Sequence, residues 1–507
     1  MNKIYLSFLG LILLLSVGCK TQSYNKGLFK EEHRPQFHFS PAAKWMNDPN
    51  GMVFLNGKYH LFYQHYPEGT KWGPMHWGHA VSKDLVHWEH QPIALFPDSL
   101  GWIFSGSAVY DKDNTSGLGK DGKAPLVAIF THHNKKLETE GRKDFQYQSI
   151  AYSLDEGKTW TKYEGNPVLK NPGIVDFRDP KVRWNEEVKR WILTLATKDR
   201  ITFFSSPDLK NWTKESEFGE TIGAHGGVWE CPDLFPMQLD GKTAWVLLVS
   251  INPGGPNKGS ATQYFVGDFD GKTFKPYSTD TKWLDWGTDN YAGITFSNTG
   301  NRSIFMGWMN NWQYAEIVPT TSWRGAATLP RELSLKTVGN SVFVSSEPVA
   351  EFSKIVGNNS SNSDVQIKGT LDLSGKIKDY NSQFQLKLAS EELKNFSIVL
   401  SNELGEELLI GYNKQDNQYF VDRSKAGKVS FEKGFGIKHI SPRISKASNT
   451  DITLIVDVSS VELFADGGLN VMTDLVFPNK TFNRLEIRSA DGFVIKSLSV
   501  AKIKGIW

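Results

Sequence analysis

"AVSKDLVHWEH" (residues 80–90) is a turn motif that returns three more times along the chain, and it indicates the fold. Each copy has a strand end, a Ser or Gly, a turn built around Asp, and then an aromatic residue. Similar hairpin turns can arise by chance, but a strand–turn–strand unit recurring at this period predicts the blades of a β-propeller. The other copies are "AYSLDEGKTWTK" (151–162), "FFSSPDLKNWTK" (203–214) and "YFVGDFDGKTFKPY" (264–277).

The remaining sequence also favours an all-β protein. Short apolar and aromatic runs lie between Gly, Asn and Asp turns, and long helical periodicity is scarce. The 507 residues are enough for two or more domains. A formal net charge of +2 argues against a nucleic-acid partner, which would need clustered Lys and Arg. Aromatic residues form 13% of the chain, an excess that a sugar-binding protein would show.

The character of the sequence changes near residue 345. Trp is absent from there until Trp507, and strands such as "DITLIVDVSSVELFADG" (451–467) alternate apolar and polar residues. Two packed sheets are the simplest fold for such strands. We therefore predict a propeller domain over residues 35–338 and a β-sandwich domain over residues 345–507.

The N-terminus has the features of a targeting segment rather than of a folded element. An apolar run over residues 4–17 is too short to be read first as a membrane span. It ends in "LSVGC" (15–19), which resembles a bacterial lipobox. We predict a lipoprotein signal peptide over residues 1–18, a lipid on Cys19, a polar tether over residues 19–34, and attachment to a bacterial outer membrane. An ordinary signal peptide followed by a chance Cys is the alternative.

Three carboxylates stand among apolar, aromatic or Pro neighbours rather than in charged runs. They are Asp48 in "WMNDPNG", Asp179 in "DFRDPKV" and Glu230 in "GGVWECPDLF". A solvated turn residue is the plain alternative for Asp48. Breaking a glycosidic bond with retention needs one carboxylate to attack the anomeric carbon and one carboxylic acid to protonate the leaving oxygen. The three residues are far enough apart in sequence to come from different blades.

In this order and spacing, the three motifs resemble the signature blocks of glycoside hydrolase family 32, which contains invertases, inulinases and levanases. The resemblance implies a five-bladed β-propeller catalytic domain followed by a C-terminal β-sandwich. It also implies that Asp48 is the nucleophile at C2 of a fructofuranosyl unit, Glu230 the acid/base and Asp179 the transition-state stabiliser. Further matching blocks are "FYQ" (62–64), "WGHAVSKDLVHW" (77–88), "FSGSAV" (104–109), "MGWMNNW" (306–312) and "RGAATLPREL" (324–333).

The resemblance further implies which residues bind fructose, and it implies no cofactor and no metal. Asp289 and Tyr291 stand in "DNYAG", where relatives usually have Phe in place of Asn290. Tyr66 stands where many relatives have Asn, which alters the region beyond the first subsite. The residues expected to bind substrate are Asn47, Gln64, Trp72, Phe104, Ser105, Arg178, Asp289 and Trp308.

Two other groups of residues have plainer explanations than chemistry. The histidines of "MHWGHAVSKDLVHWEH" (75–90) suggest zinc, but strand residues three apart point to opposite faces, so we expect them to pack. Cys231 beside Glu230 could be a reactive thiol, and we expect a small buried packing residue.

The sequence therefore predicts a retaining glycoside hydrolase that cleaves β-D-fructofuranosyl linkages in fructans through a fructosyl-enzyme intermediate. Levan, inulin and sucrose are the candidate substrates, and exo action is favoured over endo action. A fructosyltransferase, in which a sugar resolves the intermediate, is one alternative. A lipid-anchored fructan-binding protein without catalysis is the other.

Overall fold

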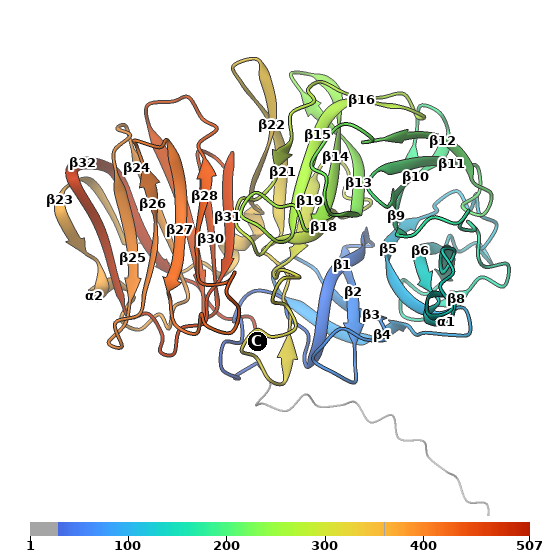
Figure 1. The fold of residues 1–507 in the computed structure, drawn as a ribbon, viewed down its shortest axis with the longest axis horizontal. Helices are drawn as coiled ribbons and strands as arrows, with labels where there is room; N and C mark the ends of the chain where they lie inside the picture. The colour runs from blue at the N-terminus through green and yellow to red at the C-terminus, as the bar shows by residue number, and fades with distance from the viewer. Residues whose placement is uncertain (1–28, 359) are drawn as a thin grey trace, which may run out of the picture.

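The computed structural model describes residues 29–358 and 360–507, which form two all-β parts side by side (Figure 1). The expected signal peptide and Cys19 lie outside these ranges. The blue-to-yellow part is a five-bladed β-propeller, and the orange-to-red part is a β-sandwich (Figure 1). In the described ranges, no helix is both long enough and apolar enough to cross a bilayer.

Each propeller blade is an antiparallel sheet, and the first strands of the five blades contact one another in a ring around the axis. These innermost strands are β1 (Lys44–Leu55), β5 (Trp102–Tyr110), β9 (Phe177–Asn185), β13 (Val228–Leu239) and β18 (Tyr291–Thr295).

The outer strands complete the blades in chain order, and the short β20 (Trp323–Arg324) pairs in parallel with β1. The outer strands are β2 (Lys58–Tyr66), β3 (His76–Ser82) and β4 (Trp88–Leu95); β6 (Leu126–His133), β7 (Gln146–Ser153) and β8 (Thr161–Lys162); β10 (Arg190–Thr197), β11 (Ile201–Ser206) and β12 (Thr213–Phe218); β14 (Lys242–Asn252), β15 (Ala261–Phe269), β16 (Phe274–Pro276) and β17 (Lys282–Trp283); and β19 (Ser303–Trp308), β21 (Arg331–Val338) and β22 (Ser341–Pro348).

The repeated turn motif lies at the same place in four consecutive blades, between the third and fourth strands. In each copy the Asp carboxylate accepts backbone N–H bonds inside the turn; Oδ1 of Asp208, for example, accepts from Lys210 at 3.0 Å and Asn211 at 2.8 Å. The indole N–H of Trp212 donates to the carbonyl of Leu209 at 3.2 Å. The motif is therefore a self-contained side-chain-to-backbone turn, and it confirms the propeller prediction.

Two expected domain limits shift in the structure. The propeller continues past residue 338, because β22 pairs along its whole length with β21 and completes the fifth blade. The described end of the expected tether, residues 29–34, packs against the propeller. Arg34 is buried there, with its guanidinium 4.4 Å from the ring centre of Trp323.

The second part is a sandwich whose two layers share two long strands, β23 (Ser360–Asp372) and β32 (Arg484–Lys502). The first half of β32 pairs with β25 and the second half with β24, so the strand passes from one layer to the other. Alternate apolar residues of both layers form one core. The remaining strands are β24 (Phe384–Ser390), β25 (Phe396–Ser401), β26 (Glu407–Asn413), β27 (Gln418–Lys425), β28 (Lys438–Pro442), β29 (Thr450–Asp457), β30 (Ser460–Ala465) and β31 (Asn470–Leu475), and the short helices of the chain are α1 (Lys135–Thr139), η1 (Ala350–Ile355) and α2 (Ser374–Ile377).

Buried charges join the two domains. Arg331 of the propeller is wholly buried, and its guanidinium donates to Glu462 of the sandwich at 3.2 Å and to Asp285 at 2.9 Å. His38 lies between Asp457 and Glu462, with each carboxylate 2.8 Å from a ring nitrogen. Burial alone would lower the pKa of His38, but these two carboxylates raise it to about 9. Arg331 and His38 therefore each pair with carboxylates of the sandwich.

Replacing Arg331 with Met should destabilise the protein by about 3–5 kcal/mol, because Asp285 would remain buried without its countercharge and Glu462 would keep only His38. The matched control is Arg302→Met in the same blade. Arg302 pairs with Glu332 and Glu351, but its side chain is 31% exposed, so we expect a loss below about 1 kcal/mol. Chemical unfolding followed by fluorescence measures both losses. Equal losses in the two variants would contradict a specific role for the buried pair.

Candidate active site

The three candidate carboxylates lie on the innermost strands of three different blades. Asp48 is on β1, Asp179 on β9 and Glu230 on β13. At this level all five innermost strands depart from regular pairing with their neighbours. A β-bulge bends a strand and re-aims its side chains, so bulges at one level turn side chains from several blades toward one place. The irregular steps are Met46/Pro49, Ile103/Gly106, Arg178/Lys181, Glu230/Asp233 and Tyr291/Ile294.

The local sequence explains three of these bulges. Pro49, Pro180 and Pro232 fall within the irregular steps, and Pro cannot donate to a ladder. Two neighbouring residues adopt the left-handed backbone region, Asp179 at φ 64° and Cys231 at φ 45°. Such a conformation costs about 1–3 kcal/mol per residue. The surrounding sheet therefore holds Asp179 and Cys231 in a backbone conformation that is unfavourable for these residues in isolation.

Asp48 is fixed by hydrogen bonds to both carboxylate oxygens. Asn47 donates to Oδ1 at 2.9 Å and Ser105 donates to Oδ2 at 2.7 Å. The Asn47 amide is itself oriented by the indole N–H of Trp45, which donates to its oxygen at 2.7 Å. Burial and the nearby charge of Glu230 raise the pKa of Asp48, while the two donors favour its ionised form.

Asp179 lies beside Asp48, with Cys231 between them. The backbone N–H of Cys231 donates to Asp179 at 3.0 Å, and its Sγ lies 3.6 Å from an oxygen of each aspartate. Burial raises the pKa of Asp179; Arg178 opposes this, and the charges of Glu230 and Asp48 add to it. Burial also raises the pKa of the Cys231 thiol, which stays protonated and contacts both carboxylates.

Glu230 has a different set of partners. Arg178 donates to its Oε1 from Nε at 3.1 Å and from Nη2 at 2.9 Å. The hydroxyl of Tyr291, from the fifth blade, donates to Oε2. Arg178 also forms an ion pair with Asp176, so one guanidinium faces several acids. Each carboxylate oxygen of Glu230 therefore accepts at least one hydrogen bond.

These groups line one pocket at the end of the propeller axis. The structure brings together nine of the residues expected from the sequence: Asn47, Asp48, Gln64, Trp72, Phe104, Ser105, Arg178, Asp179 and Glu230. The amide Nε2 of Gln64 is buried and has no hydrogen-bond partner among the described residues. An unpaired buried donor is costly, so it is well suited to receive an oxygen of a bound molecule.

Two expected residues lie outside the lining of this pocket. Asp289 is wholly buried at the domain interface, where its carboxylate accepts from Tyr314 at 2.6 Å and from Arg423 of the sandwich at 2.6 Å. Trp308 is also wholly buried, and its ring packs 4.9 Å from that of Trp312, which does line the pocket. Asp289 therefore joins the domains, and Trp308 supports the pocket wall.

Several lining residues had no signal in the sequence. His133 and Glu138 lie 3.4 Å apart on the rim, and Glu138 belongs to the short helix α1. Glu316 accepts the backbone N–H of Trp72 at 3.3 Å and so links the fifth blade to the first. Glu138 and Glu316 come from connecting segments, whose paths depend on the blades around them, whereas His133 is the last residue of β6.

The arrangement provides two carboxyl groups with separate tasks. Asp48 has its oxygens held by neutral donors, whereas Glu230 contacts a cation and a phenol. Such a pair can supply a nucleophile and a proton donor for glycoside cleavage. Within the described ranges, no cluster of three or more His, Cys, Asp or Glu side chains has the arrangement of a metal site.

Comparison with known proteins assigns the family. Residues 38–346 match the Glycosyl hydrolases family 32 N-terminal domain, and residues 351–504 match the Glycosyl hydrolases family 32 C terminal. The chain is 45% identical to a levanase of Bacillus subtilis, over 98% of this chain and 74% of the relative. It is 40% identical to an extracellular exo-inulinase of Aspergillus niger, over 92% of this chain and 93% of the relative.

The solved structures agree with this assignment. A crystal structure of exo-inulinase from Aspergillus awamori superposes with a TM-score of 0.86 at 36% identity, over 94% of this chain and all of that one. Both domains of the chain are thus matched, in sequence and in fold. This protein belongs to glycosyl hydrolase family 32.

Proposed function

We propose that this protein is a retaining fructan hydrolase that removes fructose units from chain ends. The observation that carries the proposal is the meeting of Asp48 and Glu230, from different blades, in one pocket with different hydrogen-bond partners. The substrate class is supported by the names of the relatives, levanase and exo-inulinase. A retaining reaction requires one nucleophilic carboxylate and one acid/base, and these two residues suit those tasks.

In the proposed first step, Asp48 attacks C2 of the terminal fructosyl unit. The bond from C2 to the bridging oxygen breaks, and the proton of Glu230 passes to that oxygen. Asn47 and Ser105 hold the Asp48 carboxylate in one orientation, which reduces the entropy lost on reaching the transition state. In the second step Glu230 removes a proton from water, which attacks C2 and releases fructose from Asp48.

Asp179 is proposed to bind fructose hydroxyls and to stabilise the positive charge that develops on the sugar ring. It carries no proton-transfer task, and its carboxylate is held by the backbone N–H of Cys231. An anion at this place stabilises an oxocarbenium-like transition state more than the neutral substrate. The unpaired amide of Gln64 supplies a further donor to the sugar.

Replacing Glu230 with Gln should trap the proposed intermediate. An aryl fructoside with a good leaving group needs little protonation, so its first step should be largely retained, whereas water attack should slow by orders of magnitude without a base. Mass spectrometry of a proteolytic digest should then find one fructosyl group esterified to the peptide that contains Asp48.

The control for this experiment is the double variant with Asp48→Asn added. It should give no adduct, because the nucleophile is absent. If Glu230→Gln releases the aryl group steadily and never accumulates a modified peptide, the two-step mechanism is contradicted.

Exo action is proposed from the shape of the pocket. Its lining includes Trp72, Phe104, Asp176, Asn252 and Trp312, one from each of the five blades, so the pocket has walls on every side. A surrounded pocket accepts a chain end, whereas an internal linkage needs a groove open on two sides. Several relatives are exo-inulinases, which agrees with this proposal.

The products released early from levan and from inulin test the exo proposal. We expect fructose as the main early product, with the polymer shortened slowly, because each event removes one terminal unit. Chromatography of samples taken during the first few per cent of hydrolysis measures this. A ladder of oligosaccharides at that stage would contradict exo action, and comparison of the two polymers gives the linkage preference.

We also propose that Cys19 carries a lipid and anchors the enzyme to the bacterial outer membrane. The support is the "LSVGC" segment, which lies far in sequence from the catalytic residues. Cys19→Ser should move the protein from the membrane fraction to the soluble fraction and leave the rate per molecule unchanged. Retention of the variant on membranes after a high-salt wash would contradict the anchor.

A further inference from the structure

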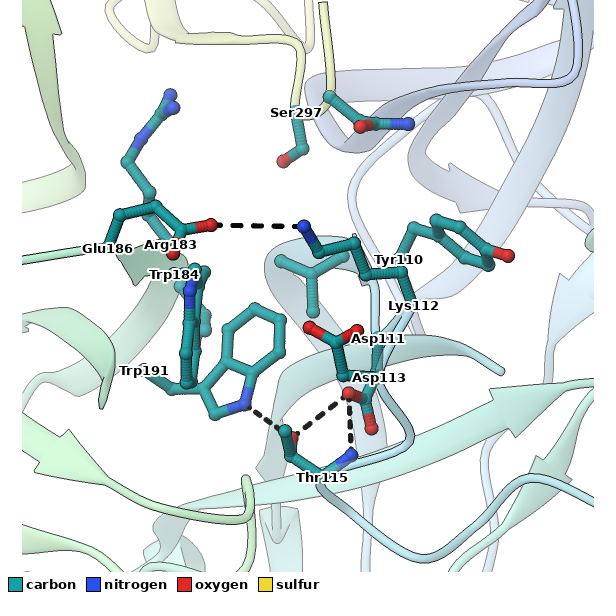
Figure 2. A pocket seen from close by; sticks show the side chains of 13 residues that line it. Tyr110, Asp111, Lys112, Asp113, Thr115, Arg183, Trp184, Glu186, Trp191 and Ser297 are labelled. Carbon is teal, nitrogen blue, oxygen red and sulfur yellow. Dashed lines mark hydrogen bonds and ion pairs between the residues drawn. The ribbon is translucent and has the colours of Figure 1, made fainter. Parts of the chain in front are cut away.

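A second cavity lies at the opposite end of the propeller axis from the catalytic pocket. Its lining comes from three blades: the end of β5 with the following loop, the middle of β9, and Ser297 after β18 (Figure 2). On β5 the catalytic pocket uses Ser105 and this cavity uses Tyr110; on β9 the two sites use Asp179 and Arg183. The same innermost strands therefore contribute to both cavities, at different heights.

Arg183 is the unusual residue in this cavity. Its guanidinium makes no hydrogen bond, ion pair or ring contact with the residues described here, and its Nε is buried without a partner. Burial lowers the pKa of this group, and the charge of Asp233 opposes that shift. Arg183 as a whole is half-buried, and its buried Nε costs free energy for as long as it has no hydrogen-bond partner.

Asp233 and Asp111 form neither an ion pair nor a hydrogen bond with Arg183. Asp233 lies 3.4 Å from the ammonium of the buried Lys181, although its charge also acts on Arg183 and its Oδ1 has no hydrogen-bond partner among the described residues. Asp111 accepts from the backbone of Thr115 and of Ser116, both at 2.8 Å. Arg183 therefore has no direct partner for its positive charge.

The remaining charged residues of the lining, Lys112, Asp113 and Glu186, are exposed. Lys112 and Glu186 face each other at 3.9 Å, with side chains 61% and 60% exposed (Figure 2). Such an exposed pair is weak and can open to admit a ligand. Its lysine can then contact the same anion as Arg183.

The wall of the cavity beside Arg183 is aromatic. Trp184 and Trp191 meet edge to face with ring centres 5.2 Å apart (Figure 2). The indole N–H of Trp191 donates to Thr115 at 2.8 Å, and this hydrogen bond fixes the orientation of the Trp191 ring. Half-buried Trp184 therefore offers a firm apolar surface next to an unpaired cation.

We propose that this cavity binds a small organic anion, with its carboxylate or phosphate group paired to Arg183 and its carbon skeleton packed on Trp184. A guanidinium forms two parallel hydrogen bonds with either oxyanion, which supplies the missing partner. The site is separate from the catalytic pocket: no residue lines both, and on β9 Lys181 lies between Asp179 and Arg183.

Calorimetric titration of the full-length protein tests this proposal with three probes: benzoate, glucose 6-phosphate and uncharged glucose. We expect one equivalent of benzoate or of glucose 6-phosphate to bind, and no binding of glucose. The response to the two anions distinguishes a carboxylate ligand from a phosphate ligand. Arg183→Gln should weaken the binding about tenfold or more, as expected for the loss of a charge-assisted pair.

Two matched variants locate the bound anion. Arg178→Gln removes the guanidinium of the catalytic pocket, and Arg190→Gln removes an exposed one from β10 of the same blade as Arg183. Both should bind the probe as the unmodified protein does. Loss of binding in Arg178→Gln would place the anion in the catalytic pocket and overturn the proposal.

The proposal is also overturned if neither anion binds the unmodified protein. It is equally overturned if Arg183→Gln binds the anion as tightly as the unmodified protein does. Circular dichroism and the rate of fructan hydrolysis show whether Arg183→Gln is folded. If it is not, Trp184→Leu takes its place. That variant keeps the guanidinium and should weaken benzoate binding, and unchanged affinity would again contradict the site.

Discussion

The site depends on a shared interruption of the five innermost strands. A regular ladder would direct alternate side chains into the blades, and its backbone groups would all be paired. In this protein every innermost strand breaks its register at one level, and three of the breaks contain Pro. The breaks turn Asp48, Asp179 and Glu230 into one pocket, where each is held by donors from a neighbouring residue or another strand. The strained backbone is stable because ordinary pairing continues on both sides of it.

Buried charge is used in opposite ways in the two parts of the structure. At the domain interface, Arg331 and Arg423 face carboxylates from the other domain, and this matching offsets the cost of desolvation. In the catalytic pocket, three carboxylates and Asp176 face the single guanidinium of Arg178. The excess of negative charge is unfavourable in the empty pocket. In the proposed mechanism this charge becomes favourable when the sugar ring gains positive charge, so the electrostatic cost in the free protein would lower the barrier to reaction.

Much of this could be predicted from the sequence, because the information is local. The repeated Asp turn needs only its own backbone, so its four copies identified the propeller. Pro within strands is a local signal too, and it could have indicated the bulges. The position of Asp289 could not be predicted, since its partner Arg423 is more than a hundred residues away in the second domain. Glu138 reaches the pocket from the segment between β6 and β7, whose path the rest of the fold determines, and His133 reaches it from the end of β6.

The charges along the axis follow from the two-residue period of a strand. Lys181 and Arg183 are two apart on β9, so both belong to the face that looks toward the axis. Lys181 is satisfied there, by Asp233 from β13 and by the carbonyl of Thr295. The next step down brings Arg183 to a level where β13 supplies no second acid, since the residues after Asp233 are Leu234, Phe235 and Pro236. A buried donor of a cation that stays unpaired is destabilising, and Asp233 offsets only part of this cost at Arg183. An oxyanion bound from solution would compensate that cost. It would stabilise the same innermost strands that carry the candidate catalytic carboxylates.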